Sequence, residues 1–427
     1  MTIAIFTGSL IGAIALGVPI AFALLICAVA LMLLQGNIDT TILSQKIIEG
    51  ADSFPLLAIP FFMLAGELMN AGGISKRIVT FALTFVGHRR GGLGFVAIFA
   101  SVLMAAISGS AAADAAAIGA LLIPMMRRAG YDVPRSAGLI AAGGVIAPVI
   151  PPSIGLIVFG VIANVSIGKL FLAGIVPGLM MGLSLLLAWV WVARRDNTKI
   201  LPRQDWGARL HAGIEGIWAL VMPAGIIGGL KLGIFTPTEA GVVACVYAFV
   251  IGAFVYRELP LRQLHPILVA AAKSTAVIVF LIATALISAW LITLSELPAQ
   301  VEAMLSPFMD NKILLMAVIM IIVVIVGTAL DFAPTLMILT PVLMPVIKQA
   351  GIDPVYFGVL FIMNNAIGLI TPPVGIVLNV MCRVANISMG DLMKGLWPFL
   401  WAELVVLFLL VLFPDLVLVP LDWLTRR

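Results

Sequence analysis

The stretch "SGSAAAD", from Ser108 to Asp114, places a carboxylate directly after "GFVAIFASVLMAAI", a run as apolar as any segment that spans a bilayer. In hydrocarbon an ionised carboxylate costs several kcal/mol unless it is paired, hydrated or bound to an ion. The acid therefore indicates either a functional site or a helix contact that carries one polar group. The rest of the sequence bears on that choice.

The composition indicates the environment in which the chain folds. Of 427 residues, 63% are hydrophobic and 10% are charged, which leaves too little polar surface to cover a soluble protein. Apolar runs recur at about the 20 residues that a spanning helix needs, without the alternating pattern of a lipid-facing barrel. We therefore expect an all-α integral membrane protein. The net charge of +4 comes from basic residues between the spans, so no nucleic-acid partner is predicted.

Hydropathy predicts nine spans, the first of them too long for a cleaved signal peptide. They cover residues 4–34, 54–69, 134–165, 168–193, 212–232, 236–256, 274–297, 354–385 and 396–419. Residues 92–128 and 312–348 are each a pair of apolar runs with a polar break halfway and basic residues at both ends. This pattern favours re-entrant hairpins with tips near the bilayer midplane, although two ordinary spans with a tight turn remain an alternative. Three mixed segments predict interfacial helices: residues 38–53, 75–90 and 297–311.

An internal repeat supports the hairpins. "IPMMRRAGYDVP" from Ile123 aligns with "MPVIKQAGIDP" from Met344, so that Pro124 pairs with Pro345, 221 positions later (345 minus 124). The predicted spans between the two copies give an odd number of crossings, and the repeat is therefore inverted. We expect a first repeat at residues 1–193, a linker with a connecting span at 194–235, and a second repeat at 236–427.

Positive charge predicts the orientation. If the base of the first hairpin is cytoplasmic, 17 of the 24 basic residues lie inside, as the positive-inside rule requires. Nine crossings then place the N-terminus inside and the C-terminus outside.

Both hairpin tips carry small polar residues and an acid, and both following spans contain a double proline, in "PPSIG" with Ser153 and "TPPVG" with Thr371. Proline removes a backbone donor and frees a carbonyl one turn earlier. Freed carbonyls persist in a membrane only where they line a cavity or hold an ion. Oxygen ligands suit an alkali cation, and half-helix ends provide dipoles for a cation or an anion. We therefore expect two cation sites beside one substrate site. Cysteine and histidine positions show no transition-metal spacing.

Each feature also has a plainer interpretation. A double proline can be only a kink, serine and threonine can bond their own helix, and "SGSAAADAAAIGA" can be a close helix contact. Asp114 can cap a helix. The recurrence of break, hydroxyl and acid at repeat-related positions favours the ion and substrate sites.

The combination of "SGSAAAD", "GIFTPTEAG" from Gly233, "GTALDFAP" from Gly327, "PPSIG" and "TPPVG" resembles the large membrane subunit of TRAP (tripartite ATP-independent periplasmic) transporters, over essentially the whole chain. The resemblance implies an elevator-type transporter of the bacterial inner membrane, not an enzyme. It also implies Na+ coupling, an organic acid substrate, a small four-span membrane subunit and a periplasmic substrate-binding protein as partners.

The motif match gives two sets of site residues. The expected sodium-binding residues are Ser108, Gly109, Ser110, Pro151, Pro152, Gly327, Thr328, Asp331, Thr371, Pro372 and Gly375. The expected substrate-binding residues are Ser110, Asp114, Ser153, Asp331 and Thr335.

Two other functions remain open at this stage. One is a cation-coupled anion transporter that works without a binding protein. The other is an intramembrane hydrolase, but no histidine or lysine lies beside Ser110, and an inverted duplication suits alternating access better. A phosphate-binding loop "GxxxxGK[ST]" does not occur, which argues against ATP-driven pumping. The particular acid and the number of sodium ions are not evident from the sequence.

Overall fold

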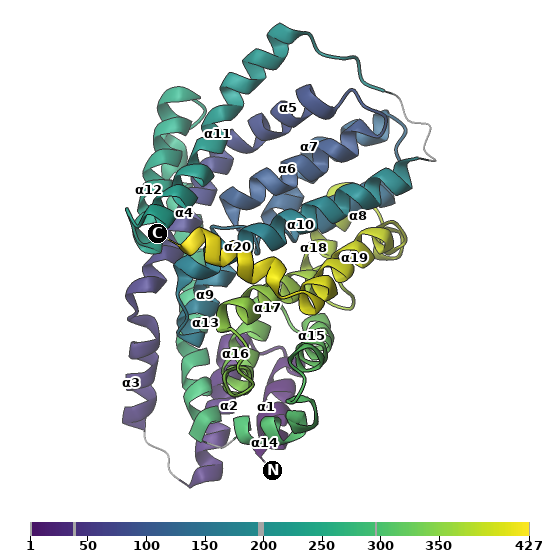
Figure 1. Ribbon diagram of the computed structural model, residues 1–427. Coiled ribbons are helices and arrows are strands. Elements are labelled where there is room, and N and C mark those ends of the chain that lie inside the picture. Colours follow the sequence, from purple (N-terminus) through teal and green to yellow (C-terminus); the bar gives the residue numbers. More distant parts are fainter. Residues whose placement is uncertain (1, 37–39, 195–199, 295–296, 427) are drawn as a thin grey trace.

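The computed structural model describes residues 2–36, 40–194, 200–294 and 297–426, and the regular elements in these ranges are helices (Figure 1). The first half contains α1 (Thr2–Ala15), α2 (Ile20–Gln35), α3 (Thr40–Ala51), η1 (Phe54–Leu57), α4 (Ala58–Ala71), α5 (Ile74–Val86), α6 (Gly92–Ser108), α7 (Ala111–Arg128), α8 (Val133–Gly144), α9 (Ile154–Ala163) and α10 (Ile167–Ala193). The second contains α11 (Trp206–Leu232), α12 (Pro237–Val250), η2 (Ile251–Val255), α13 (Leu261–Leu294), α14 (Leu297–Leu305), η3 (Ser306–Phe308), α15 (Lys312–Ala329), α16 (Phe332–Gln349), α17 (Pro354–Gly368), α18 (Ile376–Ala385), α19 (Met389–Leu412) and α20 (Asp415–Thr425).

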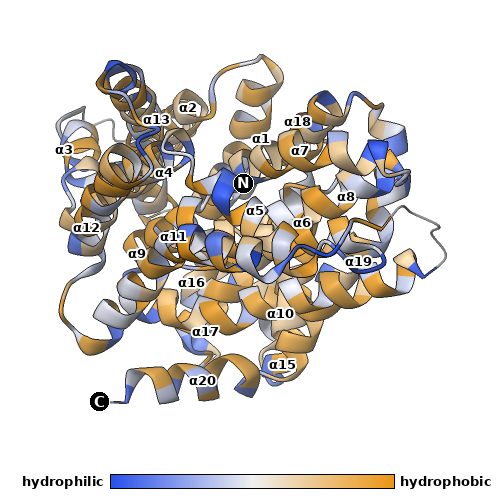
Figure 2. Cartoon of the chain, turned by 90° about the horizontal axis from the view of Figure 1, so that it is seen from above, coloured by the Kyte–Doolittle hydropathy of each residue, from blue (hydrophilic) through white to orange (hydrophobic). Residues whose placement is uncertain are grey.

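The helices are those of a membrane protein. Within the described residues, seven helices are long and apolar enough to cross a bilayer. Hydrophobic residues cover the outer faces of most helices as well as the inner ones (Figure 2), and large side chains such as Leu187 and Trp191 are more than half exposed. A protein with such a surface needs lipid around it. The predicted fold class is confirmed.

Both predicted hairpins are present. Helices α6 and α7 pack against each other and are joined by Gly109 and Ser110, while α15 and α16 are joined by Leu330 and Asp331. Gly109 has a φ of 62°, which glycine adopts without a steric cost and which reverses the chain. With 17 and 18 residues, α6 and α7 are each about 26 Å long, which is short of a full span.

The duplication is visible in the helix bounds. Helix α7 starts at Ala111 and α16 at Phe332, with the same offset of 221 (332 minus 111) that aligns the sequences. The order hairpin, broken helix, long helix (α6 to α10) recurs as α15 to α19. The caps recur as well, because Asp132 and Asp353 begin α8 and α17, and Asn164 and Asn386 end α9 and α18 in the left-handed conformation. Pro151–Pro152 and Pro372–Pro373 are both cis.

The segment at residues 4–34 is not the single span that hydropathy predicted. The chain reverses at Gly17, where φ is 76°, and Pro19 precedes the next helix. Consequently Cys27 Sγ lies 3.8 Å from the Phe6 carbonyl oxygen, whereas an unbroken helix would separate these residues by about 31 Å. Helices α1 and α2 thus form a third hairpin. A hydropathy scan misses its turn because "LGVP" is as hydrophobic as a helix.

This reversal changes the position of the N-terminus within the bundle. Helices α4 and α12 run parallel, since Thr238 Oγ1 donates to the Phe54 carbonyl (3.5 Å) at their starts. At their ends a Cβ on Gly72 would lie 3.0 Å from Gly252 Cα. Helix α12 starts at the end of α11 that is far from the 194–205 linker. The chain therefore enters α4 from that far end. Because α1 and α2 form a hairpin, the start of α1 lies at the same end of this hairpin as the end of α2.

Two further predicted bounds are wrong. The last span, predicted at 396–419, is α19, which ends at Leu412, and the separate α20 follows after Pro414. Proline cannot continue the preceding helix, and this causes the division. The span at 274–297 is part of the longer α13, which begins at Leu261.

The third hairpin leads to a prediction about membrane topology. We expect reporter domains fused to the N-terminus and to the C-terminus to lie on one side of the membrane, because Lys231, at the far end of α11, stacks on Trp423 near the C-terminus. A reporter inserted after Gln204 should lie on the other side. Alkaline phosphatase and green fluorescent protein fusions measure this. A single crossing at residues 4–34 would instead group the N-terminal reporter with the one after Gln204.

Candidate transport site

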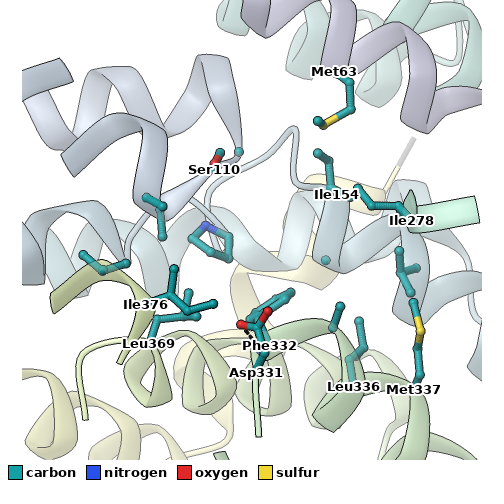
Figure 3. Close-up of a pocket in the computed structure, with 18 residues that line it drawn as sticks. Met63, Ser110, Ile154, Ile278, Asp331, Phe332, Leu336, Met337, Leu369 and Ile376 are labelled. Atoms are coloured by element: carbon teal, nitrogen blue, oxygen red, sulfur yellow. Dashed lines mark hydrogen bonds between the residues drawn. The ribbon is translucent and has the colours of Figure 1, made fainter. Parts of the chain in front are cut away.

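The two hairpin tips and the two broken helices meet at one cavity of about 270 Å³ (Figure 3). Ser110, at the tip between α6 and α7, lies on one side of it, and Asp331, at the tip between α15 and α16, lies on the other. The breaks contribute apolar residues from both repeats: Pro148, Ile154, Leu369 and Ile376. Met63 of α4 and Ile278 of α13 close the cavity from the remaining side. The structure thus brings both predicted discontinuities together.

The acid of "SGSAAAD" lies behind the first tip. Asp114 is 1% exposed, and its Oδ1 accepts a hydrogen bond from the Ser108 hydroxyl. The Ser110 backbone N–H donates to Ser108 Oγ at 3.1 Å. Asp114 Oδ2 has no hydrogen-bond partner among the described residues. Ser108 therefore connects the tip backbone to a buried carboxylate that keeps one oxygen free.

The second tip has its acid at the cavity wall. Asp331 is the N-cap of α16, where its Oδ1 accepts from the Phe332 N–H at 2.7 Å, and the Thr335 hydroxyl donates to the Asp331 carbonyl at 2.9 Å. At the repeat offset, Asp331 corresponds to Ser110, and Thr335 corresponds to Asp114. The two tips thus carry an acid and a hydroxyl at exchanged positions.

The first tip rests against the first break. A Cβ added to Gly109 would lie 3.0 Å from the Pro152 carbonyl oxygen, so the two backbones are in close contact. The Ser153 hydroxyl donates to the Pro148 carbonyl and accepts from the Leu156 N–H at 3.3 Å, which caps α9. Ser153 is fully buried and does not line the cavity. Its hydroxyl satisfies backbone groups that the break leaves free.

The second tip rests against the second break in a related way. The Val374 N–H donates to the Thr328 carbonyl at 3.4 Å, and a Cβ on Gly368 would lie 3.0 Å from the Gly327 carbonyl oxygen. The Thr371 hydroxyl donates to the Ile367 carbonyl at 2.9 Å. Gly375, with a φ of 41°, starts α18 without a side-chain cap.

The two breaks differ in exposure. Pro151 and Pro152 are buried, whereas Pro372 and Pro373 are exposed. Of the predicted site residues, Gly109, Ser110 and Asp331 line the cavity directly. The others are not among the lining residues: Ser108, Asp114, Pro151, Pro152, Ser153, Gly327, Thr328, Thr335, Thr371, Pro372 and Gly375.

Two buried asparagines were missed by the sequence analysis. The Asn365 amide donates to the Phe332 carbonyl at 2.6 Å and thereby fixes the start of α16, while the Asn364 amide donates to the Met320 carbonyl at 2.7 Å. Both Oδ1 atoms are buried and unpaired within the described part of the chain. The repeat-related positions in α8 are Gly143 and Gly144. The signal was the polar pair in "FIMNNAIG", which is as unusual in a span as the acids are.

A third missed residue is Glu403 of α19. It is fully buried, and neither carboxylate oxygen has a partner among the residues that the structure describes. It does not line the cavity. A charge scan of residues 396–419 would have found it.

The cavity offers different electrostatics at its two tips. Helix α7 begins at Ala111, and its N-cap residue, Ser110, makes no side-chain cap. The positive dipole end of α7 therefore lies at the cavity wall, with Asp114 in its first turn. At the facing tip, the Asp331 carboxylate caps α16 and adds negative charge. No basic side chain is among the lining residues. The arrangement can therefore bind an anion at α7 and a cation beside Asp331.

An all-helical membrane protein whose inverted repeats each place a hairpin tip and a broken helix at a shared central cavity is a secondary transporter. The chain belongs to the family described as "Tripartite ATP-independent periplasmic transporter, DctM component", whose model matches residues 7–416. It is thus a TRAP large membrane subunit, and its relatives are permeases rather than enzymes.

Two relatives agree with this assignment, and a solved structure has a similar fold. The chain is 54% identical to the 2,3-diketo-L-gulonate TRAP transporter large permease protein YiaN of Escherichia coli, over 99% of this chain and 100% of that one. It is 38% identical to the sialic acid TRAP transporter large permease protein SiaM of Vibrio cholerae, over 96% and 97%. The crystal structure of the Alcanivorax borkumensis YdaH transporter has a similar fold, with a TM-score of 0.62, 17% identity, and coverage of 91% and 89%.

The role of Asn365 gives a testable prediction. Replacing Asn365 with Ala removes the hydrogen bond that fixes the α16 start, so we expect uptake to fall about tenfold and the free energy of unfolding to fall by about 1–3 kcal/mol. Asn70→Ala is the control, because Asn70 accepts from Ser75 Oγ in α4–α5, away from the cavity. Equal uptake in both variants, measured at equal protein amounts, would remove Asn365 from the site.

Proposed function

We propose that this chain forms the translocation pathway of a sodium-coupled importer for an organic acid. The observation that carries the proposal is the pairing of an uncapped α7 N-terminus with the Asp331 carboxylate across one cavity. An anionic substrate group and a cation can bind side by side there, each stabilising the other.

Sodium is the proposed coupling ion because the available donors are hard oxygens. Each break and its tip supply backbone carbonyls and hydroxyls, and Asp331 supplies a carboxylate. The proposed ligands in the first repeat are Ser108, Gly109, Ser110, Pro151 and Pro152. Those in the second are Gly327, Thr328, Asp331, Thr371, Pro372 and Gly375. Coordination by such oxygens compensates an alkali cation for its lost hydration.

The proposed substrate is a hydroxylated carboxylic acid of the sugar-acid type. The carboxylate is expected at the N–H groups of α7, because no lysine or arginine lines the cavity. Ser110, Asp114, Ser153, Asp331 and Thr335 are the proposed substrate-site residues, the buried ones acting by positioning those at the wall. The names of the Escherichia coli and Vibrio cholerae relatives, which specify 2,3-diketo-L-gulonate and sialic acid, support this class.

Transport is proposed to occur by an elevator movement. The hairpins and broken helices pack on one another and would move as a unit, carrying the cavity with them. Met63 and Ile278 reach the cavity from α4 and α13, which belong to the surrounding scaffold. Their contacts are apolar and lack hydrogen bonds to the tips, so they can be exchanged at low cost.

The proposed partners are a small four-span membrane subunit and a periplasmic substrate-binding protein, in the bacterial inner membrane. The basic linker end of the bundle is proposed to face the cytoplasm. Because α1 and α2 form a hairpin, both termini then face the periplasm, in place of the cytoplasmic N-terminus that a single first span implied. Uptake by the reconstituted complex should require a sodium gradient and the binding protein. Uptake that needs neither would contradict the proposal.

The carboxylate of Asp331 provides one test. Asp331→Asn keeps the cap of α16, because asparagine caps a helix as well as aspartate does, but it removes the charge. We expect sodium-dependent uptake in proteoliposomes to fall at least about tenfold, with the thermal unfolding temperature nearly unchanged. Asp353→Asn is the control, since Asp353 is the N-cap residue of α17 and lies outside the cavity. Normal uptake with unaltered sodium dependence in Asp331→Asn would exclude this residue.

The hydroxyl of Ser110 provides a weaker, graded test. Ser110 makes no side-chain cap, so Ser110→Ala should not weaken α7, but it removes one oxygen ligand. We expect the sodium concentration for half-maximal uptake to rise severalfold. Ser166→Ala removes a true cap, at α10, and controls for helix stability. A sodium titration of Ser110→Ala that overlays that of the parent would count against the proposed ligand set.

A further inference from the structure

The second break has two sides, and one of them is exposed outside the transport cavity. Leu369 and Ile376 line the cavity, whereas Pro372, Pro373 and Val374 are exposed and are not among the lining residues. The carbonyl groups of the two prolines accept no hydrogen bond among the described residues. Irregular backbone inside a membrane protein needs water or protein beside it, because lipid offers no hydrogen bond. The exposed side of the break therefore needs one of these two neighbours.

Helix α18, which follows the break, has one polar face. Asn379 and Arg383 are exposed and lie four residues apart, so they share one side of the helix, and Asn386 is the exposed residue at its end. Leu378 and Met381, on the opposite side, are buried. The repeat-related helix α9, "IGLIVFGVIA", has no polar side chain and is mostly buried. The polar face of α18 is therefore a property of the second repeat and not of the duplicated geometry.

The polar face leads from the break to the linker end of the bundle. Arg127 Nη2, at the base of the first hairpin, donates to the Ala385 carbonyl at the end of α18 (2.7 Å), and α18 packs against α7 (Figure 2). The same base is joined to the last turns of α10 by the Trp189 Nε1 donor and the Gly91 carbonyl, at 2.9 Å, shortly before the linker. Asn379 is six residues from the end of α18, which is about 9 Å along the helix. The polar face thus extends from the linker end into the membrane interior.

The positive charge on this face has no acidic partner. Arg383 makes no ion pair or hydrogen bond within the described part of the chain, while the Asn379 amide donates to the Val374 carbonyl at 2.8 Å. An exposed arginine near a helix end fits the lipid headgroups by itself. Asn379 and the exposed break do not, because they lie deeper. Lipid explains one of these three features, and water explains all of them.

We propose that an aqueous path runs along this face of α18, from the linker end to the second break, and that Arg383 makes the path selective for anions. Because Ile376 of the same helix lines the cavity, the path and the cavity meet at the break. A hydrated guanidinium attracts a carboxylate without holding it tightly, which suits release into the cytoplasm. The identity of the anion, an organic acid, rests on the proposed function, but the water path does not.

Thiol labelling in membrane vesicles of both orientations tests the path. Val374→Cys places a thiol at the break, where the parent side chain is 37% exposed. Leu187→Cys is the lipid-facing control, because Leu187 is 61% exposed on α10, and Gln204→Cys marks the linker side. All variants also carry Cys382→Ala, since Cys382 is partly exposed whereas the other two native cysteines are buried. Size-exclusion profiles establish that the variants fold.

We expect a charged, water-soluble methanethiosulfonate to modify Val374→Cys at least about tenfold faster than Leu187→Cys, and from the side on which it modifies Gln204→Cys. The chain is labelled alone and in complex with the small subunit. Equally slow labelling of Val374→Cys and Leu187→Cys would overturn the path. So would labelling from the opposite side, or loss of labelling in the complex, because the partner would then cover the face.

The role of Arg383 is tested by the sign of the reagent charge. The labelling rates of a sulfonate and of a trimethylammonium methanethiosulfonate are compared in Asn379→Cys, one turn from Arg383. We expect Arg383→Gln to lower the ratio of the anionic to the cationic rate at least about threefold. Lys394→Gln is the matched control, because Lys394 is exposed near the start of α19 and pairs with Asp391 at 3.4 Å.

An unchanged ratio in Arg383→Gln, or an equal fall in Lys394→Gln, would overturn the role of Arg383. If Asn379→Cys does not fold, the ratio is measured in Val374→Cys. Neither labelling experiment requires transport or a coupling ion. Uptake without a sodium requirement would therefore count against the proposed function alone, and slow labelling at the break would count against the path alone.

Discussion

The structure depends on one constraint, which is that every backbone N–H and C=O inside a membrane protein must find a partner without bulk water. The chain leaves the helical conformation at two tips and two breaks, and it does so in one region. There some of these groups are satisfied locally: the Val374 N–H donates to the Thr328 carbonyl, and the Ser153 hydroxyl donates to the Pro148 carbonyl. Each tip packs against its own break, and the cavity lies where the two tips and the two breaks meet.

The two repeats solve this problem with different residues. The first buries its acid, Asp114, under Ser108 and leaves the start of α7 open, whereas the second places Asp331 at the wall. Where α8 has two glycines, α17 has Asn364 and Asn365, whose amides bond carbonyls of the second hairpin. The two repeats thus share their geometry and differ in the position of the acid at the tip and in the side chains of the helix that follows it.

Much of this arrangement could be predicted from the sequence, because hydropathy and proline positions act locally. The hairpins at 92–128 and 312–348 match α6–α7 and α15–α16 almost to the residue. The α1–α2 reversal could not be predicted in this way, because its turn, "LGVP", is as apolar as the helices that it joins. The partners of Asn364 and Asn365 lie on other helices, α15 and α16. Only the packed structure brings them together.

The shared contacts between tip and break also suggest how an ion and a substrate can act on each other. A cation bound by carbonyls of the second break and by Asp331 would hold the second tip in place, because the Thr328 carbonyl and the Val374 N–H already join these two elements. The wall that faces the open start of α7 would then be fixed before the carboxylate arrives. The bound ion would offset the conformational entropy lost when the second tip is ordered. The substrate would then bind to a site that is already formed. Coupling of this kind needs no long pathway, since the ion ligands and the substrate wall lie on the same few residues.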